Sequence, residues 1–185
     1  MQSTLVSEIW PVSRDSRIAQ ALLVLAGTGL LAISAKIQVP FWPVPMTMQT
    51  FVVLVLGLTY GPRLGFATGA LYLLEGALGL PVFAKGAGVA YLMGPTGGYL
   101  FGFVAAMTVM GLLTTRGWSR TGLGVLAAML VGEVLIFAPG VLWLSVAVGL
   151  QKGVALGLTP FLVAELFKVL LAAVTLPLVW RALKR

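Results

Sequence analysis

Four ionisable side chains lie within long apolar stretches of the sequence: Glu75, Glu133, Glu165 and Lys168. A charge inside a membrane helix costs about 2.5–3.5 kcal/mol, so each side chain needs a partner or a cavity. Glu165 and Lys168 are three residues apart and therefore share one face of a helix. Two interpretations are open: the pair forms a mutual salt bridge, or it binds a polar, uncharged ligand group. A cyclic urea would suit the second, because a carboxylate accepts N–H hydrogen bonds and an ammonium donates to a carbonyl oxygen.

For the other two acids we keep both alternatives as well. Glu75 is either a boundary residue that reaches water or a loop lysine, or part of a polar site. Glu133 is either paired structurally within a helix bundle or part of that same site. Gln49 either caps a helix or faces a pocket. Lys85 is either an ordinary loop charge or, if its glycine-rich segment folds over a pocket, a partner for a ligand carboxylate.

Four aromatic residues near the irregular segments either line a ligand site or lie at the membrane–water interface, where aromatic rings are enriched: Trp42, Phe83, Tyr91 and Tyr99.

The composition is that of a membrane protein. Of the 185 residues, 59% are hydrophobic and only 9% are charged, whereas a soluble domain has about 25% charged residues. Apolar runs close to the ~18 residues that cross a bilayer recur without strand-like alternation, which predicts an all-α polytopic helix bundle rather than a barrel. The sequence has no Cys and no His. It therefore offers no disulfide, thiol or imidazole chemistry, and we expect neither a catalytic nor a metal site.

We predict one membrane domain over residues 1–185, with about six transmembrane helices after a short interfacial segment at about 1–16. The predicted helices span residues 17–35, 46–60, 64–78, 96–115, 123–143 and 159–180. The first follows two arginines, as a secretory signal does, but we expect it to be retained because the rest of the chain is membrane-embedded. Prolines make 36–45 non-helical, 79–95 is a glycine-rich loop, and 145–157 is a looser connection. Small residues at four-residue spacing, such as Gly94, Gly98 and Gly102, predict close helix packing.

The basic residues predict the orientation. Six helices place both termini on one side, together with Arg14, Arg17, Arg63, Arg116, Arg120, Arg181, Lys184 and Arg185, whereas the other side has Lys36, Lys85 and Lys152. Lys and Arg are enriched in cytoplasmic loops, so we expect both termini to be cytoplasmic and the irregular segments to be external. The net charge of +7 thus reports topology and does not indicate nucleic-acid binding.

Three motifs and a residue pair resemble the BioY family. They are VPFWPVPMTMQTF at 39–51, GLPVFA at 79–84, GPTGGYLFGF at 94–103, and the step Glu165-Leu-Phe-Lys168 in the last helix. The resemblance covers residues 18–180. It implies a biotin-binding S component of an energy-coupling factor (ECF) transporter in the cell membrane. Such a component captures biotin externally, and a transmembrane coupling subunit and two cytoplasmic ATPases drive its release inward.

The resemblance also implies a distribution of roles. The family's last-helix pair usually reads Asp-x-x-Lys and contacts the ureido ring, so Glu165 and Lys168 would take that part. Aromatic residues such as Trp42 and Tyr99 would face the thioether ring. The carboxylate tail would meet Lys85 or backbone N–H groups at Gly97 and Gly98. We include Gln49, Phe83 and Tyr91 in the expected ligand-binding set.

The sequence has no P-loop, because Lys85-Gly86 lacks the required glycine spacing and Ser or Thr. We therefore expect no cofactor of the chain's own and ATP use only through partner subunits. The alternative is a stand-alone or oligomeric biotin carrier that works without ATPase partners.

Overall fold

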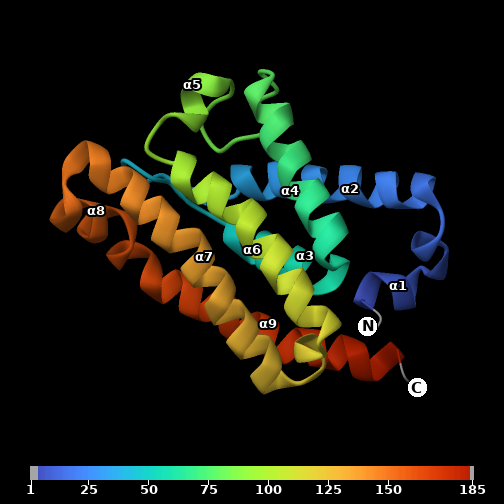
Figure 1. The fold of residues 1–185 in the computed structure, drawn as a ribbon. Helices are drawn as coiled ribbons and strands as arrows, with labels where there is room; N and C mark the ends of the chain where they lie inside the picture. The colour runs from blue at the N-terminus through green and yellow to red at the C-terminus, as the bar shows by residue number, and fades with distance from the viewer. Residues whose placement is uncertain (1–3, 184–185) are drawn as a thin grey trace.

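The computed structural model describes residues 4–183 and is mainly helical (Figure 1). With η denoting 3-10 helices, the elements are α1 (Leu5–Ile9), η1 (Pro11–Arg14), α2 (Arg17–Lys36), β1 (Gln38–Val39), β2 (Met46–Thr47), α3 (Gln49–Tyr60), α4 (Pro62–Ala77), α5 (Val89–Leu92), α6 (Gly97–Thr115), η2 (Trp118–Arg120), α7 (Gly122–Val148), α8 (Leu150–Gly157), η3 (Thr159–Phe161) and α9 (Leu162–Leu183). The predicted helices at 17–35, 64–78, 96–115 and 159–180 are confirmed, with ends that shift by a few residues.

Two predicted segments were wrong. The helix predicted from residue 46 begins at Gln49, because Met46–Thr47 forms β2 and pairs antiparallel with β1 in the register Gln38 to Thr47. The connection predicted at 145–157 is helical: α7 continues to Val148, and α8 follows after the positive-φ residue Gly149. Most residues of this region are apolar, and the chain is helical through them where we expected a connection.

Helix α7 passes through Pro139 without ending. Proline cannot donate to the carbonyl of Leu135, four residues earlier. Gly102 of α6 packs against that carbonyl, and a Cβ at Gly102 would lie 2.7 Å from its oxygen. The predicted close packing by small residues of α6 is therefore confirmed at Gly102, and α6 lies centrally against α3, α4 and α7.

Within residues 4–183, four segments are long and apolar enough to cross a membrane: Arg17–Lys36, Gly97–Thr115, Gly122–Val148 and Leu150–Ala182, which takes in α8 and most of α9. Helices α3 and α4 have 12 and 16 residues, fewer than the ~20 that span a bilayer. The count of six transmembrane helices therefore stays a prediction.

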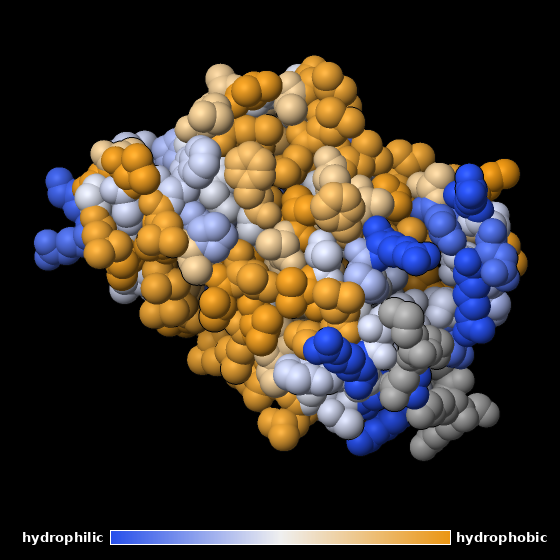
Figure 2. Space-filling view, viewed as in Figure 1, coloured by the Kyte–Doolittle hydropathy of each residue, from blue (hydrophilic) through white to orange (hydrophobic). Residues whose placement is uncertain are grey.

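The two ends of the bundle differ in polarity. Helix α1 and the end of α9 lie at one end, while α5 and α8 lie toward the other (Figure 1). Most hydrophilic side chains on the face in Figure 2 gather at the end with α1, and apolar side chains cover much of the rest. Lys184 and Arg185, counted above among the basic residues, lie outside the described residues.

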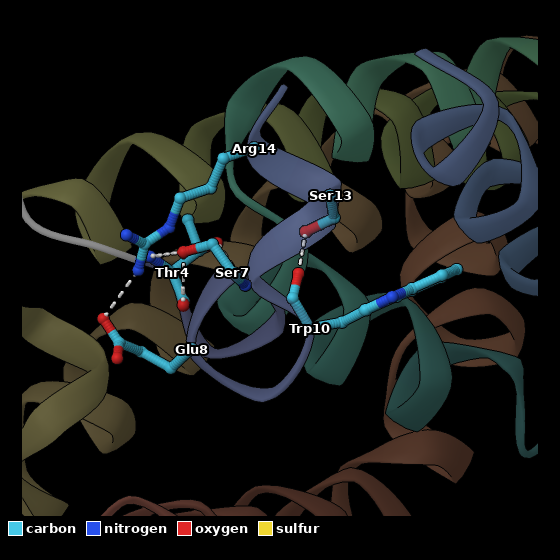
Figure 3. A network of polar contacts seen from close by, with 6 residues as sticks. All are labelled: Thr4, Ser7, Glu8, Trp10, Ser13 and Arg14. Carbon is cyan, nitrogen blue, oxygen red and sulfur yellow. Dashed lines mark hydrogen bonds and ion pairs between the residues drawn. The ribbon is translucent and has the colours of Figure 1, made fainter. Parts of the chain in front are cut away.

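The N-terminal segment is folded onto the bundle. Thr4 and Ser7 cap α1, and Leu5 is buried against the core. Figure 3 shows Ser13 Oγ donating to the Trp10 carbonyl at 2.7 Å, and Arg14 paired with Glu8 at 3.2 Å. Helix α1 packs against α3 and α9. Its placement at the membrane interface remains a prediction.

Candidate functional site

Glu165 and Lys168 of α9 form a buried ion pair that is anchored to the start of α3. Lys168 Nζ donates to Glu165 Oε1, to Thr50 Oγ1 and to the Thr47 carbonyl, each at 2.8 Å. Thr50 Oγ1 in turn donates to Glu165 Oε2 at 2.8 Å. All three ammonium protons are thus in use. The two side chains are only 9–10% exposed, so the pair is shielded from water.

The β1–β2 hairpin makes this anchor possible. In a helix that began at Met46, the Thr47 carbonyl would accept from the backbone N–H four residues later. Because Met46–Thr47 is a strand and Gln49 begins α3, that carbonyl is instead available to Lys168. Met48 N donates to the Ile37 carbonyl at 3.0 Å, which ties the hairpin to the end of α2.

A cavity of about 40 Å³ lies beside the ion pair. Its polar end carries Glu165, Thr50 and Gln49, and its walls are largely aromatic. The lining residues are Val44, Pro45, Thr47, Gln49, Thr50, Ala84, Tyr91, Thr96, Tyr99, Leu100, Phe103, Phe137, Phe161 and Glu165. Phe137 packs edge-on against Tyr99 at 5.6 Å and against Phe161 at 5.7 Å, measured between ring centroids. The cavity thus joins a charged end to an aromatic body.

Side-chain hydrogen bonds fasten the proline-rich segment to the glycine-rich segment over this region. Lys36 Nζ donates to the Phe83 carbonyl at 2.6 Å, and Gln38 Nε2 donates to the Ala84 carbonyl at 3.2 Å. Lys85 Nζ donates in the reverse direction, to the Phe41 carbonyl at 3.3 Å. Residues of both segments line the cavity, so these bonds tie together the two parts of its lining, which we call the cover.

Hydrogen bonds and ring stacking hold in place the part of the cavity lining that contains Gln49 and Tyr91. Gln49 Nε2 donates to Tyr72 Oη at 2.6 Å, and Tyr72 Oη donates to the Val82 carbonyl at 2.9 Å. The Phe83 ring is fully buried between Tyr72 and Tyr91, stacking on Tyr91 at 5.1 Å.

Comparison with known proteins identifies this architecture. The model of the BioY family matches residues 5–185. The chain belongs to the BioY family. It is 41% identical over 156 residues to the biotin transporter BioY of Thermotoga maritima, covering 82% of this chain and 90% of that one. It is 39% identical over 153 residues to the probable biotin transporter BioY of Pyrococcus horikoshii, with the same coverage.

The fold also matches a crystal structure described as the S-component for biotin from an ECF-type ABC transporter. The TM-score is 0.73 and the identity 22%, over 91% of this chain and 93% of that one. Transport, and not catalysis, is the activity given in the names of the BioY relatives. With its apolar spans, this BioY chain is a multi-pass membrane protein and not an enzyme.

The structure brings some of the expected ligand-binding residues of this BioY chain to the cavity. Gln49, Tyr91, Tyr99 and Glu165 line it. Lys168 reaches it through its bonds to Glu165 and Thr50, and Phe83 lies behind Tyr91. Their roles in ligand binding stay predictions.

Four other expected residues lie elsewhere. Trp42 is 76% exposed and does not line the cavity, and Lys85 bonds the Phe41 carbonyl on the outside. Gly97 and Gly98 pack against backbone: a Cβ at Gly97 would collide with the Leu92 carbonyl, and one at Gly98 with that of Pro139. Close packing thus accounts for both glycines in this conformation.

Sequence reasoning missed much of the aromatic wall. Phe161 lies one helical turn before Glu165, and Phe137 lies one turn after Glu133. Residues four apart share a helix face, so this spacing from the buried acids was the available signal. For Thr50 the available sequence signal was simpler, because Thr50 adjoins Gln49 within the family motif.

Proposed function

We propose that this chain captures biotin on the external side of the cell membrane, as the substrate-binding S component of an ECF transporter. One observation carries the proposal: a member of the BioY family places a buried Glu–Lys pair at one end of an aromatic-lined cavity. Its relatives are named as biotin transporters, and its fold resembles a biotin S component.

The chemistry of biotin suits this arrangement. A carboxylate has about four lone-pair positions, and Glu165 uses one on each oxygen for Lys168 and Thr50. A remaining lone pair accepts a ureido N–H group. The aromatic wall receives the thioether ring, since sulfur packs favourably against aromatic edges.

Lys168 can donate to the ureido carbonyl only by giving up a present partner, because its three protons are already committed. The Thr47 carbonyl is the partner that exchanges. It belongs to the hairpin of the cover, whereas Thr50 and Glu165 lie on helices. Binding of biotin therefore loosens the hairpin from α9.

The cover opens to admit biotin. A cavity of about 40 Å³ is far below the ~300–1,000 Å³ of small-molecule sites. The bonds from Lys36, Gln38 and Lys85 to backbone carbonyls hold the cover. Either lysine gains a charge-assisted hydrogen bond by exchanging a neutral carbonyl for the biotin carboxylate, and Lys85 is our candidate for that contact.

The orientation and the partners complete the proposal. We place both termini and the basic end in the cytoplasm, following the distribution of Lys and Arg, and the cavity end outside. The chain forms one membrane domain with six helices, in which α3 and α4 are short. A transmembrane coupling subunit and ATPases supply the energy, because the sequence has no P-loop.

Reconstitution tests this assignment. The purified chain in liposomes is expected to bind labelled biotin without concentrating it, and to support concentrative uptake only with the coupling subunit, the ATPases and ATP. Concentrative uptake by the chain alone would instead establish the stand-alone carrier. Failure to bind biotin under any condition would contradict both.

A further inference from the structure

A third acid, Glu133 of α7, lies beside the ion pair. Both of its carboxyl oxygens are buried, and none of residues 4–183 donates a hydrogen bond to them in the structure. Its carboxyl group interacts with Glu165 and with Lys168. Phe137, one turn further along α7, lines the cavity. Glu133 is thus close to the proposed ligand-binding carboxylate.

The charges around Glu133 do not balance if both acids are ionised. Helices α3 and α6 contain no Asp, Glu, Lys or Arg. Lys168 is the cation of α9 that faces Glu133, and its three protons already serve Glu165, Thr50 and the Thr47 carbonyl. Tyr99 of α6 donates to the Gly157 carbonyl. A second carboxylate would therefore be buried without compensation, which is strongly unfavourable.

A protonated carboxyl group removes this conflict and gains a donor. Resting on the proposed function, we propose that Glu133 is a positioning residue of the biotin site, which holds a proton and donates it in a hydrogen bond to Glu165. The group of three then carries one negative and one positive charge. The bond fixes the rotamer of Glu165 and leaves one of its lone-pair positions directed at the cavity for a ureido N–H group.

Substitutions at Glu133 separate this role from simple packing. Glu133→Leu removes the donor and is expected to weaken biotin binding about tenfold or more, as expected for loss of a hydrogen bond to a charged group. Glu133→Gln keeps a neutral donor at the same position and is expected to recover most of that loss. Val134→Leu, at an exposed position of the same helix, is the matched control and keeps wild-type affinity.

The pH dependence of binding is the readout that packing alone would not change. Once the pH is high enough to ionise wild-type Glu133, two carboxylates lie close together without compensation, so the affinity for biotin is expected to fall as the pH rises further. Glu133→Gln cannot ionise, so its affinity falls less over the same range. This comparison needs only the wild type and Glu133→Gln, so it holds even if the Leu variant does not fold.

Three results would overturn the proposal: wild-type affinity in Glu133→Leu, a Gln variant as weak as the Leu variant, or identical pH profiles for wild type and Glu133→Gln. Glu165→Gln, measured beside these variants, separates failure of the Glu133 role from failure of the proposed contact between Glu165 and biotin. If Glu165→Gln loses affinity while Glu133→Leu does not, the Glu133 role alone fails. If both variants bind biotin like wild type, the Glu133 role and the proposed contact between Glu165 and biotin both fail.

Discussion

Two ion pairs at opposite ends of the molecule contain the same kinds of charge in different surroundings. Arg14 and Glu8 lie 3.2 Å apart with side chains 49% and 40% exposed (Figure 3), whereas Lys168 and Glu165 lie 2.8 Å apart with side chains 10% and 9% exposed. Water solvates the first pair if it separates. The second has only protein groups as substitutes, so each of its atoms needs a defined partner. Burial thus makes one pair depend on defined protein partners and leaves the other a surface contact.

The backbone around the two pairs differs in the same way. At the end with α1, Gly111 packs tightly on Pro62, and Thr4 and Ser7 cap α1. At the cavity end, side-chain donors such as Lys36 and Gln38 hold loop carbonyls. Packing contacts of the first kind have no polar partner to exchange with a ligand, whereas a donor of the second kind can exchange its carbonyl for a ligand acceptor. From this contrast we expect a rigid end at α1 and a cover that opens at the cavity end.

The largest difference is expected on removing one cation from each pair. Lys168→Met leaves Glu165 buried without its counter-charge, which costs about 3–5 kcal/mol of folding free energy, and we expect biotin binding to be lost. Arg14→Met is expected to cost no more than about 1 kcal/mol and to keep biotin affinity. Thermal unfolding and biotin titration of both variants in detergent provide the measurement. Equal destabilisation of the two would contradict the comparison.

The sequence predicted the elements better than the cavity that they enclose. Apolar runs and glycine spacing indicated most helices, because membrane insertion and close packing constrain those residues locally. The strand at Met46–Thr47 was missed because apolar composition alone does not separate a strand from a helix start. The hairpin depends on contacts with Ile37 and Lys168, residues distant in sequence.

The candidate site shows the same limit. The spacing of Glu165 and Lys168 predicted a shared face, and the structure shows both a bond between them and an adjoining cavity. Trp42 looked equally suitable as an aromatic wall residue, yet it is exposed. Whether a loop side chain points into a cavity is decided by the loop conformation, which no periodic pattern encodes.

The two ends can also be compared through single hydroxyl groups, one buried at the cavity end and one exposed at the other end. Tyr99 Oη donates to the Gly157 carbonyl at 2.7 Å in the interior. Tyr99→Phe leaves that carbonyl without this donor and is expected to lower the free energy of unfolding by about 1–3 kcal/mol. Thr115→Val removes a hydroxyl from the exposed end of the same helix, where Thr115 Oγ1 donates to Leu112, and is expected to have a smaller effect. Thermal unfolding that ranks them in the opposite order would contradict this assignment.

The cover can be tested through the rate of binding. Lys36→Met removes the donor to the Phe83 carbonyl but keeps an apolar stem of similar length. We expect biotin to associate severalfold faster, because the closed cover is less stable, as measured by stopped-flow fluorescence. Lys152→Met, on exposed α8, serves as the control. An unchanged association rate in Lys36→Met would show that this bond does not limit entry.

The smallest effect on binding is expected at the basic end. Charge reversal at Arg63 or Arg116, both exposed, leaves the cavity unaltered and is expected to keep wild-type affinity for biotin. Uptake with the coupling subunit and the ATPases is expected to fall, since we place this end in the cytoplasm, on the side of the ATPases, and propose that it docks there. Parallel loss of binding and uptake would count against the separation of the two ends.

One matched pair of substitutions tests the binding role of the buried pair most directly. Glu165→Gln and Glu8→Gln make the same chemical change in the two ion pairs, and calorimetric titration gives the biotin dissociation constant of each purified variant. We predict that Glu165→Gln remains folded and binds biotin at least about tenfold more weakly, as expected for hydrogen bonds that lose a charged acceptor, while Glu8→Gln binds like wild type. Wild-type affinity in Glu165→Gln would show that the buried pair is structural and that biotin is recognised elsewhere.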